Sequence, residues 1–415
     1  MYTVRCNNMM KYSKNRAMTF VELMVAMTIS IMLMAATYYI AKTQLGTSQS
    51  QQEVMSAYKD ARMALTYLKS DISAAGFMAT PDLQTDASGK PIDPDICTLP
   101  TLNQTMRPVA IQLERPTNNL YLGNYNQKIH PMSIVLFGSY PSHLVFRTDH
   151  IQGKNIYLQN GTGTNFPIQA EFNRIFSISH ILRLVNQNNK ILFFRIIGRD
   201  YSSAKIIVNQ TVPAASGNCG VAGFGRGLAV NSTAFIRYRL KRKTDPNQSA
   251  LRNHYVLIQE ELNPFNNWSP VVNTTIPIAD HAVDLQFYDF AIDTDTTGQD
   301  PDLSSFKWKP NPFTLPESVL MQGIATPVPV YLGSDPTKSA SYGAKDLRFM
   351  TIKLSLSTSD EDHSITYKQG IGSSGPGNHK PIDYFDIDPS SEGLARVVSI
   401  LSKVELTNLA ARNMK

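Results

Sequence analysis

The sequence predicts an α+β fold in which one long N-terminal helix packs on a mainly antiparallel, β-rich C-terminal domain. Two observations support this prediction. The 19 residues from Leu23 to Ala41 contain no charge and no proline, and their Met, Leu, Ala and Ile residues favour a helix. After Pro81 the chain changes to short β-rich runs separated by Gly, Pro, Asn and Asp, which is the pattern of strands and turns.

The uncharged segment near the N-terminus is long enough to cross a membrane. At about 1.5 Å per residue, a helix over Leu23–Ala41 spans the hydrocarbon core of a bilayer. A secretory signal peptide would have a shorter apolar region, followed by a small-residue cleavage site. Here the small residue, Ala17, lies on the basic side of the segment. Processing is therefore expected before the apolar run, which would leave residues 18–41 on the mature protein as a membrane helix.

The helix is predicted to continue beyond this run. Apolar residues recur there with alternating spacings of four and three, which predicts one buried helix face. They are Val54, Tyr58, Ala61, Leu65, Leu68, Ile72 and Ala75. No proline occurs before Pro81, and Gly76 is a natural stop. We expect a helix from Met18 to about Ala75, with an amphipathic continuation inside residues 42–79 that packs on the chain's own domain.

The remaining chain, residues 80–415, is expected to form one β-rich domain. Its strand-like runs include a hairpin with strands at 181–185 and 190–197. The other runs are 132–138, 143–149, 232–243, 253–262, 282–293, 347–357 and 398–409. Long insertions are expected near 80–105, 150–170, 292–345 and 364–385.

The net charge of +6 is partly a property of the N-terminus. Four of the 39 basic residues precede the apolar run, which leaves 35 against 33 acidic residues. The charge balance is therefore poor evidence for nucleic-acid binding. Of the three cysteines, Cys6 lies in the leader, whereas Cys97 and Cys219 lie in the β-rich part. Two cysteines in an exported domain indicate one disulfide, and the alternative is two unpaired buried thiols.

The N-terminus resembles the type IV prepilin signal, in which a basic leader and a small residue precede a run such as "MTFVELMVA" at 18–26. The resemblance implies that a prepilin peptidase removes residues 1–17 by cutting between Ala17 and Met18, and that the new Met18 amine is methylated. The family usually has Gly where this chain has Ala17, which predicts less efficient cleavage. A start at Met10 would shorten the leader to eight residues.

Glu22 occupies the family's acidic position, with Thr19 and Phe20 beside it in the assembly segment. A carboxylate near one end of a membrane helix costs up to about 3 kcal/mol. The Met18 amine of a neighbouring subunit would offset that cost by ion pairing in a medium of low dielectric constant. The alternative is an accidental acidic residue in a plain anchor.

Later stretches resemble PilW-type minor pilins, namely 61–77, 277–295 and 397–413. This resemblance implies a non-enzymatic protein that takes part in starting type IV pilus assembly, for adhesion, twitching or DNA uptake. The implied partners are other minor pilins, the major pilin, the inner-membrane assembly platform and a tip adhesin. The implied location is the inner membrane, with a periplasmic domain, and then the filament. The alternatives are a minor pseudopilin of type II secretion and a membrane-anchored periplasmic binding or hydrolytic protein.

Other candidate sites are weaker. Asp293, Asp295, Asp300 and Asp302 alternate around a glycine as Ca²⁺ ligands would, but Ser304 stands where an EF-hand needs its glutamate. No cofactor is otherwise expected. Arg237, Arg239, Lys241 and Lys243 share one strand face, which is either simply solvated or a contact for anionic surfaces or DNA. The stretches "DEDH" at 360–363 and "GVAGFGRG" at 220–227 are interpreted as turns, and no catalytic motif is recognisable.

Overall fold

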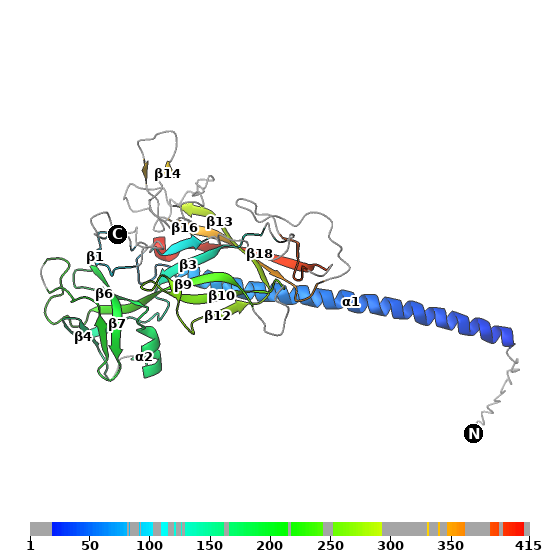
Figure 1. Ribbon diagram of the computed structural model, residues 1–415, viewed down its shortest axis with the longest axis horizontal. Helices are drawn as coiled ribbons and strands as arrows, with labels where there is room; N and C mark the ends of the chain where they lie inside the picture. The colour runs from blue at the N-terminus through cyan, green and yellow to red at the C-terminus, as the bar shows by residue number, and fades with distance from the viewer. Residues whose placement is uncertain are drawn as a thin grey trace, which may run out of the picture. The chain divides into compact units, whose positions relative to one another are not determined.

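The structure is a computed structural model of the 415-residue chain. The residues that it describes are 19–80, 83, 91, 93–102, 109–114, 120–121, 126, 129–161, 166–214, 217–243, 252–292, 330–331, 339–340, 347–361, 382–389 and 393–410. The chain divides into two compact units, Met1–Glu53 and Val54–Lys415. A long helix followed by antiparallel sheets confirms the predicted α+β, pilin-like fold (Figure 1).

Helix α1 runs from Phe20 to Ser73, a little shorter at each end than the sequence predicts. Its threonine and serine residues do not interrupt it, because their hydroxyls bond back to carbonyl groups one turn earlier. Thr28 Oγ1, for example, donates to the carbonyl oxygen of Val25 over 2.9 Å. The helix ends just before Gly76, whose φ of +76° is a left-handed conformation that favours glycine.

In the first unit the apolar side chains of α1 are exposed. Met34, Tyr38 and Tyr39 are each 72% exposed, and Leu33 is 63% exposed. The helix is long and apolar enough to cross a membrane, judged by length and composition. Since the chain itself supplies no cover for this segment among the described residues, its apolar surface requires a membrane or another protein.

In the second unit α1 buries one face. Its fully or nearly fully buried residues are Ala57, Ala61, Ala64, Leu65, Leu68 and Ile72. The predicted face is thus correct at four positions in the helix, but Tyr58 is 46% exposed. The reason is that a straight helix has 3.6 residues per turn, so a strict seven-residue repeat drifts around it. Ala57 and Ala64 complete the buried face instead.

The larger sheet has twelve strands, with β9 at its centre. Their bounds are β1 (Ile96–Thr98), β2 (Ile111–Glu114), β3 (Ser133–Gly138), β4 (Phe146–Gln152), β5 (Asn155–Leu158), β6 (Ile181–Val185), β7 (Ile191–Asp200), β8 (Lys205–Val208), β9 (Ala229–Arg242), β10 (Tyr255–Asn263), β11 (Ser269–Pro270) and β12 (Ile276–Ala279). The main path is β1-β7-β8-β5-β4-β9-β10-β11. Strand β9 also pairs with β3 and β6, and among the strand pairs that the structure describes in this sheet only β1 with β7 is parallel. The predicted hairpin is β6–β7, with Val185 opposite Ile191.

The second sheet has four antiparallel strands in the order β13-β16-β18-β17. They are β13 (Ala282–Ile292), β16 (Leu347–Ser357), β17 (Tyr384–Phe385) and β18 (Ala395–Glu405). A two-stranded pair consists of β14 (Val330–Tyr331) and β15 (Ser339–Ala340), and the short helices are α2 (Gln169–Ile175) and α4 (Thr407–Ala410). The region 150–170, expected to be an insertion, therefore contributes β5 and the start of α2.

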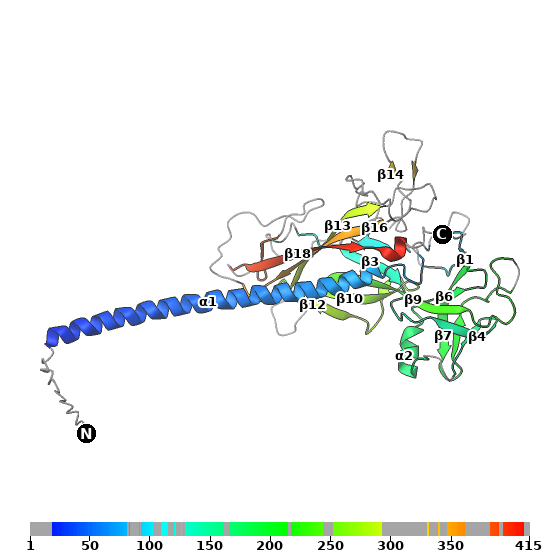
Figure 2. The same ribbon diagram turned by 180° about the vertical axis from the view of Figure 1, so that it is seen from behind.

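The main core joins the buried face of α1 to strands of both sheets (Figure 2). One polar contact fixes this packing: Asp71 Oδ2 accepts hydrogen bonds from the Tyr238 hydroxyl at 2.6 Å and from Gln259 Nε2 at 2.7 Å. Burial raises the pKa of Asp71, although these bonds oppose the shift. A second core lies between α2 and strands β4 to β9, around Phe172, Phe194 and Ile206. The domain thus has one core to which α1 contributes and a second core that contains no residue of α1.

Candidate functional site

The first turn of α1 is closed by reciprocal hydrogen bonds between Thr19 and Glu22. The backbone N–H of Thr19 donates to Glu22 Oε2 over 2.9 Å, and the Thr19 hydroxyl donates to the same oxygen over 3.0 Å. In return, the backbone N–H of Glu22 donates to Thr19 Oγ1 over 3.3 Å. This is a capping box, which satisfies N–H groups that a helix leaves without an internal partner. Its sequence signature, T-x-x-E, is visible at residues 19–22.

The capping box engages one oxygen of the Glu22 carboxylate. All the bonds from Thr19 go to Oε2, so Oε1 is left to accept from another donor. The neighbouring side chains on the helix are apolar and exposed: Phe20 is 75% exposed, Val21 67% and Leu23 44%. In a membrane or a protein interior, such a carboxylate is stabilised by a cation placed at its second oxygen.

The predicted cleavage residues, Ala17 and Met18, lie outside the described residues. Cleavage between them, methylation of the Met18 amine and the ion pair with Glu22 therefore stay predictions. Thr19 and Phe20, predicted to take part in assembly, are the residues at which the helix begins. The geometry adds that Thr19 orients Glu22 within the same chain.

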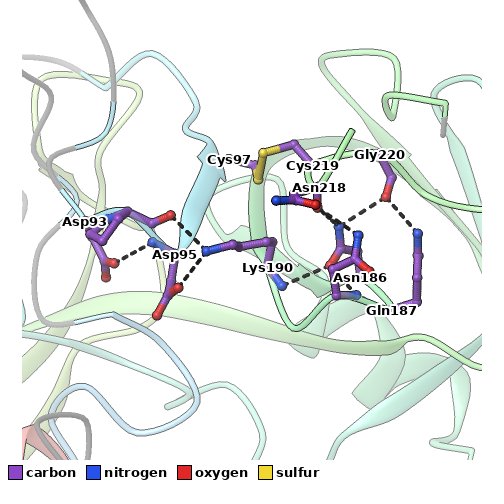
Figure 3. The surroundings of a disulfide bond; sticks show 11 residues. Asp93, Asp95, Cys97, Asn186, Gln187, Lys190, Asn218, Cys219 and Gly220 are labelled. Atoms are coloured by element: carbon purple, nitrogen blue, oxygen red, sulfur yellow. Dashed lines mark hydrogen bonds and ion pairs between the residues drawn. A yellow bond between two sulfur atoms is a disulfide. The ribbon is translucent and has the colours of Figure 1, made fainter. Parts of the chain in front are cut away.

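The expected disulfide between Cys97 and Cys219 is present (Figure 3). The two Cα atoms are 5.5 Å apart, and the residues are 122 positions apart in sequence. Cys97 belongs to β1, while Cys219 lies in the loop that precedes β9. The bond therefore joins an edge strand of the larger sheet to a distant loop, inside the second unit.

The turn between β6 and β7 binds both sides of this disulfide (Figure 3). On one side, Asn186 Nδ2 donates to the carbonyl oxygens of Asn218 at 2.8 Å and Gly220 at 3.1 Å. On the other side, Lys190 Nζ lies 2.9 Å from Asp95 Oδ1. The disulfide and the turn hold the same two segments, so the loop keeps polar contacts to the sheet in addition to the covalent bond.

A comparison with protein families matches residues 12–38 to the prokaryotic N-terminal methylation motif. No curated protein matches the chain, and no solved structure does either. The matched segment contains the predicted cleavage residues, the capping box and the start of the apolar helix. This motif and the apolar N-terminal helix support a type IV pilin-like protein. The motif implies processing by a prepilin peptidase and assembly with other pilins, and it is shared by pilins and pseudopilins.

The predicted basic face consists of Arg237, Arg239 and Lys241 on β9 and of Lys243 directly after it, and carboxylates face much of it. Arg237 Nη2 lies 2.5 Å from Glu260 Oε1, and Arg239 Nη2 donates to Glu260 Oε2 over 3.2 Å. Glu260 is only 1% exposed. Lys243 takes part in a further ion pair over 3.1 Å. Because these cations neutralise carboxylates of the same chain, the face offers DNA less positive charge than the sequence suggests.

A serine, a histidine and a glutamate meet in the interior, although the sequence shows no such motif. Ser232 Oγ lies 3.2 Å from His180 Nδ1, and His180 Nε2 lies 2.8 Å from Glu261 Oε1. However, His180 Nδ1 also lies 2.7 Å from the carbonyl oxygen of Ile175, which can only accept. The proton on Nδ1 is therefore directed at this carbonyl oxygen, and Nδ1 has no lone pair with which to activate the serine. Ser232 is also fully buried, so we interpret the group as a structural network.

The remaining candidates carry no site in the described chain. The four aspartates of the Ca²⁺ candidate, Asp293, Asp295, Asp300 and Asp302, lie outside the described residues. In the loop "GVAGFGRG", Gly223, Gly225 and Gly227 have φ values of +60°, +66° and +76°, as expected of a turn. Of "DEDH", Glu361 accepts two backbone hydrogen bonds, a structural role considered further below.

Proposed function

We propose that this chain is a PilW-type minor pilin that takes part in initiating type IV pilus assembly. The observation that supports this most is the methylation motif leading directly into a helix whose first half exposes apolar side chains around one oriented carboxylate. Such a segment suits storage in the inner membrane and later packing against other pilins. The domain after the helix would face the periplasm first and the filament surface later.

The mechanism that we propose is assembly rather than catalysis. Thr19 fixes the Glu22 carboxylate at the helix start, with Oε1 left for a second donor. The methylated Met18 amine of a neighbouring pilin would occupy that position in the filament. The β-rich domain would contact other minor pilins, the major pilin, the assembly platform or a tip adhesin. Ca²⁺ is not required by this mechanism.

The size of the domain favours a pilus over a type II secretion pseudopilus, because minor pseudopilins are usually much smaller. The second unit alone covers Val54–Lys415. Deletion of the gene is expected to reduce the number of surface pili and to leave secretion of type II substrates unchanged. Loss of secretion with normal piliation would favour the pseudopilin instead.

The mature N-terminus tests the proposal directly. The full chain would be purified from membranes of cells with and without prepilin peptidase, and its N-terminal peptide identified by mass spectrometry. We expect methylated Met18 at the N-terminus only when the peptidase is present. An intact N-terminus in both strains, or cleavage after residue 41, would contradict the pilin proposal and favour a membrane-anchored periplasmic protein.

A further inference from the structure

Residues 382–389, called the strap below, carry β17 and pack on the second sheet through apolar side chains. Ile382 and Phe385 are each 1% exposed, and they share a cluster with Tyr121, Tyr255 and Val283. Two backbone bonds tie the strap to other segments. Asn253 N–H donates to the carbonyl oxygen of Ile387 over 2.7 Å, and Val397 N–H donates to that of Asp383 over 2.9 Å.

Asp386 is a buried carboxyl group in the middle of the strap. It is 2% exposed, and its Oδ1 accepts no hydrogen bond from the described residues. Its backbone, by contrast, is fully engaged. The carbonyl oxygen accepts from Asn126 Nδ2 at 2.7 Å and Asn253 Nδ2 at 3.1 Å, while the N–H donates to Asn126 Oδ1 over 3.2 Å. The backbone thus holds in the interior a side chain that would be hydrated if it could turn outward.

Two further carboxylates face Asp386. Glu361, which follows β16, accepts hydrogen bonds from the backbone N–H groups of Ile387 at 2.8 Å and Asp388 at 2.7 Å. Asp388 lies on the strap itself, and its charge is shared with Arg252, whose Nε is 3.4 Å from Asp388 Oδ2. Burial, followed by the charges of Glu361 and Asp388, raises the pKa of Asp386 to about 6.

We propose that Asp386 is a proton-operated switch that tightens the strap in mildly acidic surroundings and loosens it at neutral pH. Protonation removes the buried charge and its repulsion by Glu361 and Asp388, and it turns the carboxyl group into a hydrogen-bond donor. Above the transition the charge must be kept in the interior or the strap must open. This inference concerns the folded domain and is independent of the proposed role in pilus assembly.

The direction of the pH effect follows from linkage. The folded-state pKa of Asp386, about 6, lies above the value of about 3.9 for an unfolded aspartate. Between these values the folded strap binds more protons than the open one, so its stability falls as pH rises towards 6 and then stays low. Two pKa units correspond to at most about a 100-fold change in the opening equilibrium.

A proton is favoured over a metal ion as the neutralising species. Within the part of the chain that the structure describes, no group of three or more His, Cys, Asp or Glu side chains could hold a metal. The titration of His281 changes the stability of the folded state with pH in the opposite direction. Burial and the neighbouring His254 lower the pKa of His281, which disfavours the folded state as pH falls. The switch must therefore be measured as a difference between variants at each pH.

The experiment compares Asp386→Asn with the wild-type chain by amide hydrogen exchange of the strap, using the full chain in detergent at pH 5 and pH 7.5. Asparagine has nearly the same shape as the protonated side chain. We expect exchange in the variant to be up to about 100-fold slower than in wild type at pH 7.5, and this ratio to be about tenfold smaller at pH 5, where the carboxyl group of the folded strap is largely protonated. The control is Asp383→Asn, an exposed strap position, which should change neither ratio.

Three results would overturn the switch: equal exchange in variant and wild type at both pH values, faster exchange in the variant at pH 7.5, or a thermal stabilisation of wild type by Ca²⁺ that Asp386→Asn abolishes. A second variant covers the case in which Asp386→Asn does not fold. Glu361→Gln keeps an acceptor for Ile387 and Asp388 but removes one repelling charge. The pH midpoint of strap exchange should then move down, and an unchanged midpoint would also count against the switch.

Discussion

Both parts of helix α1 are built from residues that favour a helix, but they differ in burial. In the second unit one face of the helix is buried by the described residues, whereas in the first unit its apolar side chains are exposed. In the first unit Leu33 is 63% exposed, whereas in the second unit Leu68 is fully buried. Leu68 contributes to a core that includes strands of both sheets. The same residue type therefore stabilises the fold in one part of the helix and serves an external partner in the other.

The two parts of the helix are stabilised in different ways. The second part of the helix is fixed by apolar packing and by Asp71, which binds Tyr238 and Gln259. The first part has a well-capped start at Thr19 and Glu22, but its apolar surface has no cover among the described residues. A helix of this kind can leave one apolar environment for another without disturbing the domain, provided that its charge at Glu22 stays neutralised.

The largest effect is expected from Glu22→Ala, which tests the exposed part of the helix. The variant should be processed and should fold, because the second unit does not include Glu22. Its incorporation into filaments should fall by about tenfold or more, since breaking a buried ion pair costs several kcal/mol. The measurement is the amount of chain in sheared filaments relative to the amount in membranes.

Glu22→Gln is the matched control, because glutamine preserves a capping box but carries no charge. If the charge is what assembly needs, this variant should fail as Glu22→Ala does. Normal incorporation of Glu22→Gln would show that capping by Thr19 is sufficient, and the ion-pair explanation would be wrong.

The second prediction compares the two leucines directly. Leu68→Ala should lower the free energy of unfolding by about 3 kcal/mol, because it opens a cavity in the main core. Leu33→Ala should change it by less than about 0.5 kcal/mol, since its side chain is largely exposed. Both are measured by thermal unfolding of the full chain in the same detergent. Equal losses for the two variants would mean that the contrast between the helix parts is not energetic.

Local sequence patterns were enough to predict α1 and the longer strands, but not short elements such as β5, β8 and α2. Absence of charge and proline predicted α1, Gly76 predicted its end, and the hairpin of β6 and β7 was visible from its turn. These features depend on residues close together in sequence, whose preferences act before any distant contact forms. The amphipathic face was predicted only approximately, because small changes in helical phase decide whether a side chain such as Tyr58 is covered.

Long-range pairing was not predictable from such patterns. Strands β3 and β4 follow each other around a turn, yet each pairs with β9 rather than with the other. Likewise, nothing local distinguishes Lys353 and Asp284, which are 1% and 0% exposed and form a buried ion pair between β16 and β13. The capping box at Glu22 is different, because its signature lies within four residues and could have been recognised.

The smallest effect is expected from removal of the disulfide. Both cysteines lie in the second unit, so this change tests how far the packing of that unit stabilises it without the covalent bond. The variant Cys97→Ser/Cys219→Ser frees a loop of more than 100 residues, for which chain entropy alone gives roughly 4–5 kcal/mol. We expect a smaller loss of about 2 kcal/mol, because residual structure in the unfolded chain reduces the entropy that the bond removes. Thermal unfolding with and without reductant measures it. The reductant should not change the double variant, and Asn186→Ala in that background should deepen the loss. If the loss reached the full chain-entropy value, the second unit would depend on its covalent bond more than this comparison predicts.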